Sequence, residues 1–231
     1  MNKLTAGWIC EFVGTFALMF VGGAAILHEY DKGNIVAVAL AHGLILSVMV
    51  SATMHISGGQ LNPAVSIGLA IIRRQTWGQA AAWVVAQLLG SALAAKVLQL
   101  VFLPSSVANG KLGATLGVLS TPDTIMPLLA LEAIATFFLM FVILGSAVDN
   151  RGVGGNRAVG GFGIGLTVAG CILAIGPFTG ASMNPARSFG PALVGGFWDV
   201  HWAYWVAPLI GATVAALVWD LVMIPRSKPT A

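Results

Sequence analysis

Two closely similar segments occur in the chain, one in each half of the sequence. Residues 57–68 read SGGQLNPAVSIG, and residues 179–190 read TGASMNPARSFG. Aligned without a gap, both contain the tripeptide Asn-Pro-Ala, at Asn62, Pro63 and Ala64 and again at Asn184, Pro185 and Ala186. A shorter pattern, Glu-x-x-x-Thr-Phe, begins upstream of each segment, at Glu11 and at Glu132. The sequence therefore predicts a duplicated structure, with repeat 1 at about 1–110 and repeat 2 at about 120–231.

The composition places this duplicated chain in a membrane. Of its 231 residues, 58% are hydrophobic and 8% are charged, with a mean hydropathy of +0.91. Soluble domains carry about 25% charged residues, and a soluble protein this apolar would expose large aggregating patches. A net charge of +3 is too small to indicate nucleic-acid binding. Cys10 and Cys171 lie in apolar runs and are expected to be buried thiols, so no disulfide, metal or other cofactor is predicted.

Six stretches are long and apolar enough to cross a bilayer, which takes about 20 residues. They are residues 7–27, 35–55, 79–103, 125–148, 158–177 and 201–224. Glu11 belongs to the duplicated pattern and would be lost on cleavage, so the first stretch is expected to be a retained span and not a signal peptide. One membrane-spanning domain, 1–231, is expected.

The two Asn-Pro-Ala segments are too short to be full spans. Proline suits the first turn of a helix, and the preceding asparagine suits its N-cap. A helix of about nine residues is about 13 Å long, roughly half of the bilayer core. We therefore expect two half-helices that enter from opposite faces and meet near the midplane.

Each repeat contains three spans, an odd number, so the second repeat is expected to insert inverted. With the N-terminus inside, the cytoplasmic cations are Lys3, Arg73, Arg74, Arg151, Arg157, Arg226 and Lys228. The outer loops then hold Lys32 and Lys111. This bias obeys the positive-inside rule. It predicts cytoplasmic N- and C-termini in a multi-pass protein of the cell membrane, plasma or inner.

Irregular backbone at membrane depth is tolerated where protein buries it or where it lines a water-filled cavity. The segments before the two tripeptides have this character, and their carbonyl groups are expected to line a pore: Gly58, Gly59, Gln60 and Leu61, and Gly180, Ala181, Ser182 and Met183. Glu11 and Glu132 are intramembrane carboxylates, which are costly and usually functional. We expect each to brace one of these loops by accepting hydrogen bonds from its N–H groups. A proton relay or a loose surface acid is the alternative.

Taken together, the two Asn-Pro-Ala boxes, Arg187 directly after the second box and the repeated Glu-x-x-x-Thr-Phe resemble the aquaporin (major intrinsic protein) family over essentially the whole chain. The resemblance implies an all-α membrane protein with six transmembrane helices, two re-entrant half-helices and an inverted internal repeat. It also implies one pore per subunit, a homotetramer, and passive water transport that excludes protons and ions. Water, small neutral solutes and the bilayer are then the expected partners, with no nucleic acid.

Matching to the family also implies a selectivity filter of His42, Ile172, Ala181 and Arg187, with Val65 as the counterpart of Arg187 in the first repeat. His42 stands where ordinary water channels have Phe. The set is similar to that of plant vacuolar aquaporins, some of which also pass ammonia, urea or peroxide. Solutes are expected to accept hydrogen bonds from Arg187 and His42. The alternatives are that His42 is a packing residue and that Arg187 pairs with a helix acid.

His55 matches a family position at the cytoplasmic mouth of the pore. It is expected either to gate the pore or to line it while hydrogen-bonded to a carbonyl group. Ser188, Ala192 and the pair Tyr204-Trp205 are of the water-channel type rather than the glycerol-channel type. A facilitator of glycerol or other small solutes is the main alternative. An alternating-access transporter, which would need coupling carboxylates, is another. An enzyme is not expected, because no constellation of nucleophile, base and acid is found.

Overall fold

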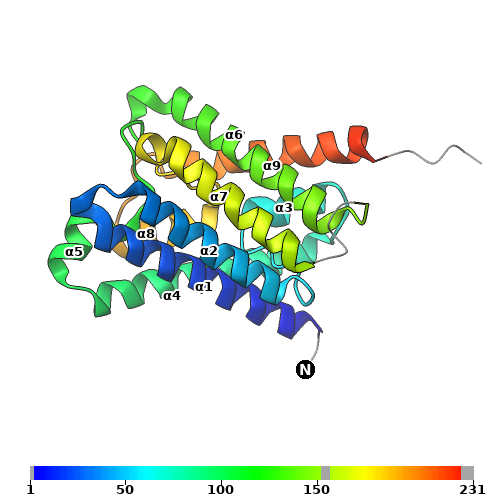
Figure 1. Cartoon of the computed structure of the whole chain (residues 1–231), viewed down its shortest axis with the longest axis horizontal. Helices are drawn as coiled ribbons and strands as arrows, with labels where there is room; N and C mark the ends of the chain where they lie inside the picture. The colour runs from blue at the N-terminus through cyan, green and yellow to red at the C-terminus, as the bar shows by residue number, and fades with distance from the viewer. Residues whose placement is uncertain (1–2, 152–156, 225–231) are drawn as a thin grey trace, which may run out of the picture.

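The computed structural model describes residues 3–151 and 157–224, and within these ranges all regular secondary structure is helical (Figure 1). The long helices are α1 (Lys3–Glu29), α2 (Ile35–Thr53), α4 (Trp77–Val101), α6 (Ile125–Ile143), α7 (Arg157–Thr179) and α9 (Ala203–Val218). Single π-helical turns extend α6 over Leu144–Val148 and α9 over Trp219–Met223. All six are long and apolar enough to cross a membrane, which confirms the predicted spans.

Shorter helical segments connect the spans. They are α3 (Pro63–Ile71), α5 (Pro104–Asn109) and α8 (Pro185–Gly195), with 3₁₀ turns at Tyr30–Lys32, Lys111–Gly113 and Pro122–Thr124. Both α3 and α8 begin at the proline of an Asn-Pro-Ala box, as predicted. The asparagine side chains cap them: Asn62 Oδ1 accepts from the N–H of Ala64, and Asn184 Oδ1 accepts from the N–H of Ala186. Proline costs nothing there, since the first-turn N–H has no intrahelical partner.

Glycines let equivalent helices approach closely in the two repeats. A Cβ atom on Gly90 of α4 would clash with the carbonyl oxygen of Phe12 in α1. In the second repeat, a Cβ atom on Gly211 of α9 would clash with the carbonyl oxygen of Ala133 in α6. When Glu11 is aligned with Glu132, Phe12 aligns with Ala133 and Gly90 aligns with Gly211, so the two contacts are equivalent. Small residues at helix crossings are typical of membrane bundles, where close packing replaces the hydrophobic effect.

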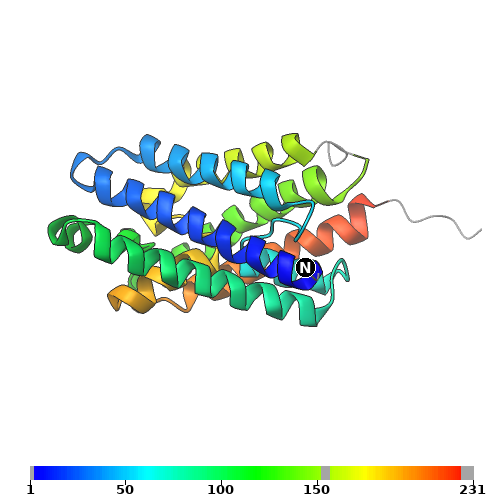
Figure 2. The same ribbon diagram turned by 90° about the horizontal axis from the view of Figure 1, so that it is seen from below.

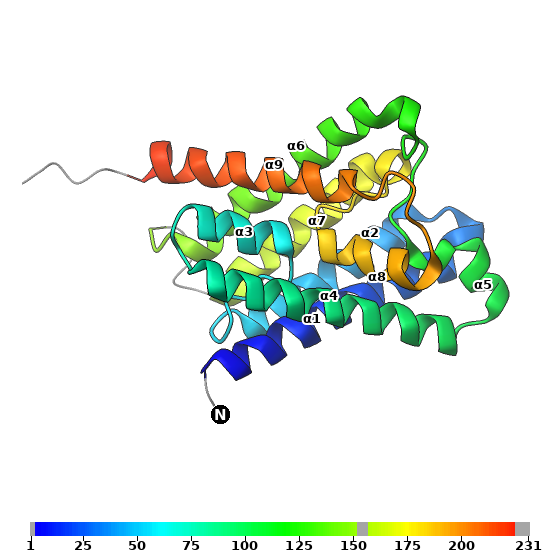
Figure 3. The ribbon, with the colours of Figure 1, turned by 180° about the vertical axis from the view of Figure 1, so that it is seen from behind.

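The two halves interlock around the half-helices. Helix α3 packs against α9 of the other half as well as against α4, and α8 packs against α4 and α1 of the first half. Figure 3 shows α3 and α8 between α9 and α4, each nearer a different end of the bundle. This is the arrangement expected of an inverted repeat.

The start of α1 and the end of α9 lie at the same end of the bundle, which Figures 1 and 2 show from two sides. Arg74 and Arg151 belong to this end, because Arg74 Nη2 lies 3.7 Å from Asp220 Oδ1 and Arg151 Nη2 donates to the carbonyl oxygen of Met223, both in the turn that extends α9. The outer loops with Lys32 and Lys111 lie at the opposite end. We call the first end the cytoplasmic end below, after the orientation that the sequence predicts. Two of the expected cytoplasmic cations, Arg226 and Lys228, lie outside the described residues.

Candidate functional site

The carboxylate of Glu11 organises the loop before the first half-helix. Its Oε1 accepts from Ser57 Oγ at 2.6 Å and from the N–H of Gln60 at 2.9 Å. Its Oε2 accepts from the N–H of Leu61 at 2.6 Å and from Gln87 Nε2 at 2.8 Å. Glu11 is fully buried, so four hydrogen bonds replace the water that a buried charge has lost.

Glu132 makes the equivalent contacts in the second repeat. Its Oε1 accepts from Thr179 Oγ1 at 2.7 Å and from the N–H of Ser182 at 2.9 Å, and its Oε2 accepts from the N–H of Met183 at 2.8 Å. Glu132 is also fully buried. Burial of both glutamates excludes the alternative of loose surface acids.

These contacts fix the direction of the loop carbonyls. In a trans peptide the N–H and the preceding C=O point in opposite directions. The N–H groups of Gln60 and Leu61 point at Glu11, so the carbonyls of Gly59 and Gln60 point away from it. By the same geometry, the carbonyls of Ala181 and Ser182 point away from Glu132. These four residues with turned carbonyls all line one central cavity.

Unusual backbone angles accompany this orientation. Leu61 has φ of 50° and Met183 has φ of 51°, a left-handed conformation that a side chain disfavours. Each stands directly before an Asn-Pro-Ala box. Such strain persists only where surrounding contacts over-determine it, and here the buried glutamates bond the N–H groups of these two residues.

The two asparagines reach across to each other's loop. Asn62 Nδ2 donates to the carbonyl oxygen of Met183, and Asn184 Nδ2 donates to that of Leu61, both at 2.8 Å. An amide nitrogen carries two hydrogens, so each asparagine retains a second donor. Both asparagines line the central cavity, where that donor can meet a solute.

Arg187 is held by two acceptors near the outer end of this cavity. Its Nη1 donates to the carbonyl oxygen of Gly113 at 2.8 Å, and its Nη2 lies 3.1 Å from His42 Nε2. His42 Nδ1 lies 2.8 Å from the carbonyl oxygen of Val38. A carbonyl can only accept, so the proton of the neutral ring is on Nδ1, and Nε2 accepts from Arg187. Both guanidinium partners are uncharged, unlike the helix acid of the alternative interpretation.

One expectation about His42 is therefore wrong. The sequence suggested that solutes accept a hydrogen bond from this residue. In the structure its Nδ1–H group donates to the carbonyl oxygen of Val38 in the same helix, and its Nε2 accepts a hydrogen bond from Arg187. His42 positions the guanidinium, and the donor available to a solute is Arg187.

Three cavities follow one another through the bundle. The outer cavity shares His42, Ile172 and Arg187 with the central one. The cytoplasmic cavity shares Gly59, Gln60, Val65, Ile143 and Ile164 with the central one, and His55 lies on its wall. Ala181, the fourth predicted filter residue, is buried and lines the central cavity. The structure thus brings the predicted filter residues and seven of the eight predicted loop residues to these three adjoining cavities. The exception is Leu61, which is fully buried and lines none of them, and its carbonyl oxygen accepts from Asn184 Nδ2.

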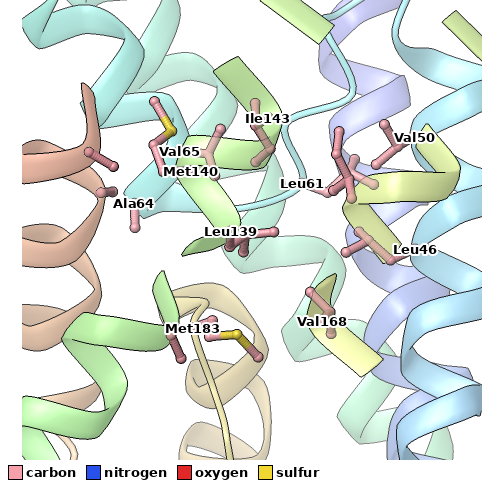
Figure 4. Packing of buried hydrophobic residues seen from close by; sticks show 14 of the residues in the cluster. Leu46, Val50, Leu61, Ala64, Val65, Leu139, Met140, Ile143, Val168 and Met183 are labelled. Carbon is pink, nitrogen blue, oxygen red and sulfur yellow. The ribbon is translucent and has the colours of Figure 1, made fainter. Parts of the chain in front are cut away.

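The central cavity has two chemically different walls. One carries the loop carbonyls, the asparagine amides and Arg187. The other is apolar, and Figure 4 shows its side chains converging from several helices. They include Leu46, Val50, Val65, Leu139, Ile143 and Val168. The hydrogen-bonding groups of the cavity therefore come from the loops, the asparagines, His42 and Arg187, and these apolar side chains offer none.

Several supporting residues escaped prediction from the sequence. Gln87, a polar residue in the apolar run of α4, donates to both Glu11 Oε2 and Ser66 Oγ, and its position in that run was an available signal. The backbone carbonyl of Gly113, which accepts a hydrogen bond from Arg187, could not be identified from the sequence because every residue has such a group. Tyr204, of the water-channel type, donates its hydroxyl to the carbonyl oxygen of Thr179 at 2.6 Å and so supports the second loop.

The comparisons with known proteins agree with this geometry. A family model described as "Major intrinsic protein" matches residues 2–219. The chain belongs to the major intrinsic protein family. It is 47% identical to "Aquaporin TIP4-4" of Zea mays, over 92% of this chain and 84% of that protein. It is 42% identical to "Nodulin-26" of Glycine max, over 93% of this chain and 76% of that protein.

The fold is also that of a solved structure, the aquaglyceroporin from Plasmodium falciparum, with a TM-score of 0.86 and 26% identity. That similarity covers 95% of this chain and 97% of the other. The protein is therefore a multi-pass membrane channel of the class that passes water or small solutes.

Proposed function

We propose that the protein is a passive water channel that excludes protons and ions, in which Glu11 and Glu132 brace the two loops. The observation that carries this proposal is the path of shared cavities, where Asn62, Asn184 and Arg187 provide donors opposite an apolar wall. A homotetramer in the cell membrane, with cytoplasmic termini, completes the proposal.

Exclusion of protons follows from the two half-helices. The N-termini of α3 and α8 carry partial positive charge, and the asparagine amides donate at the same place. A water molecule there must accept hydrogen bonds, so its own hydrogens point toward the two ends of the path. A chain of waters oriented away from the centre cannot relay a proton through it, and the positive helix ends also repel cations.

Arg187 and its neighbours form the proposed filter at the outer end. The fixed guanidinium repels cations and supplies donors to a passing solute. Ile172 is apolar and Ala181 is small, so this filter leaves room for small neutral solutes beside water. We propose water as the main solute, with measurable flux of ammonia or hydrogen peroxide and smaller flux of urea and glycerol.

Stopped-flow light scattering on proteoliposomes tests the proposal. The expected result is water flow above that of empty liposomes, with a low activation energy and no dependence on an ion gradient. Dependence on such a gradient would indicate an alternating-access transporter, and glycerol flow exceeding water flow would indicate a glycerol facilitator. Native mass spectrometry of the purified protein tests the tetramer.

A further inference from the structure

A pair of glutamine side chains forms a reciprocal contact at the cytoplasmic end of the central cavity. Gln60 Nε2 donates to Gln75 Oε1 at 2.7 Å, and Gln75 Nε2 donates back to Gln60 Oε1 at 3.2 Å. Gln75 Nε2 also donates to the carbonyl oxygen of Ser66 in α3, at 2.6 Å. The Gln75 amide is thus anchored to the half-helix, and it fixes the Gln60 amide.

Gln60 occupies the junction between two of the cavities. It lines both the central and the cytoplasmic cavity, and Gln75 lines the cytoplasmic one. Gln60 is only 9% exposed. A Cβ atom on Gly58 would lie 3.3 Å from Gln60 Nε2, so the amide is held close to the loop backbone. A solute that moves between the two cavities passes this side chain.

The second repeat has no comparable feature at its equivalent positions. Ser182 is the counterpart of Gln60, and its short side chain bonds to the carbonyl oxygen of Asn184 in its own loop. Phe197 is the counterpart of Gln75. The cytoplasmic half therefore carries a longer side chain, with several staggered rotamers open to it unless something restrains it.

We propose that Gln75 is a positioning residue, which holds the Gln60 amide against the loop and keeps the junction between the cavities open. The proposal rests on the water-channel function proposed above. Held in this way, Gln60 retains one N–H and one lone pair for passing water, because a primary amide has two donor hydrogens and two acceptor positions. Once released, Gln60 samples rotamers that cross the junction and obstruct flow.

The test compares three variants by stopped-flow water permeability, normalised to the number of reconstituted channels. Gln75→Ala releases Gln60. If the three χ1 rotamers become equally populated, the held conformer falls to about one third, so permeability falls by up to about threefold. Adding Gln60→Ser to Gln75→Ala gives this position the side chain of the other repeat and is expected to restore permeability. The control Gln79→Ala removes an amide from the same cytoplasmic end and is expected to leave permeability unchanged.

Each other outcome overturns the proposal. Unchanged permeability in Gln75→Ala shows that Gln60 needs no restraint, and increased permeability shows that the pair itself narrows the path. A loss that Gln60→Ser does not restore shows that Gln75 merely anchors α3, and an equal loss in Gln79→Ala shows a general need for polar groups there. The parent protein separates the two proposals: no water flow in the parent contradicts the channel function itself.

Discussion

Replacing Glu132 by glutamine tests the brace with a minimal change in volume. The glutamate oxygens accept three hydrogen bonds, from Thr179 Oγ1 and from the N–H groups of Ser182 and Met183. A glutamine keeps one oxygen and replaces the other with an NH₂ group, which cannot accept. In either orientation of that amide, one backbone N–H of the loop loses its acceptor.

The magnitude follows from these contacts. A hydrogen bond to a charged group contributes about 1.5–3 kcal/mol, against about 0.5–1.5 kcal/mol for a neutral pair. One such bond is lost and two are weakened, so we expect Glu132→Gln to destabilise the protein by about 3 kcal/mol. For a chain of this size that lowers the melting temperature by roughly 6–12 °C. Glu11→Gln is expected to lose at least as much, since Glu11 accepts four hydrogen bonds.

Thermal unfolding of the detergent-solubilised protein measures the effect, together with water permeability per folded channel. Asp220→Asn is the matched control, because Asp220 lies beside the end of α9 and its Oδ1 lies 3.7 Å from Arg74 Nη2, with both side chains partly exposed. Such surface pairs contribute little, about 0–1 kcal/mol. An unchanged melting temperature and unchanged permeability in Glu132→Gln would refute the brace.

Three further predictions concern selectivity and packing. His42→Phe should reduce hydrogen peroxide flux more than water flux in proteoliposomes, because added bulk excludes the larger solute first. Equal loss of both would refute the filter assignment. Arg187→Val, which copies Val65 of the first repeat, should raise cation or proton leak measured with a fluorescent dye, and an unchanged leak would count against the guanidinium barrier. Gly90→Val and Gly211→Val should each lower the free energy of unfolding by roughly 1–3 kcal/mol, because the added side chains overpack the helix crossings. If both variants kept the melting temperature of the parent protein, close approach of the helices at these crossings would be shown to be unnecessary.

Much of the architecture could be predicted because it depends on patterns that a sequence displays directly. The six spans followed from apolar length, and the half-helices followed from proline and asparagine in two matching segments. The inversion followed from an odd number of spans per repeat. The predicted ends of the spans differ from the observed ones by a few residues, since a bilayer constrains apolar length more tightly than helix ends.

The partners of individual polar groups were less predictable. The role of His42 depends on which of its nitrogens carries the proton, and a backbone carbonyl in the same helix decides that. Arg187 is held by the carbonyl of Gly113, 74 residues away along the chain, and a backbone group leaves no trace in a side-chain pattern. The reciprocal contact of Gln60 with Gln75 likewise depends on how the loop folds back beside α3. Such contacts become visible only when the fold brings their members together.

Parallel measurement of water and proton flux in the same proteoliposomes tests the central claim most directly. Water flow is recorded after an osmotic step, and proton flow is recorded with an enclosed pH-sensitive dye after a pH step. We predict that water permeability rises in proportion to the amount of reconstituted protein, while proton permeability stays at the level of empty liposomes. Water permeability at the level of empty liposomes, or proton permeability that rises with the protein, would contradict the account.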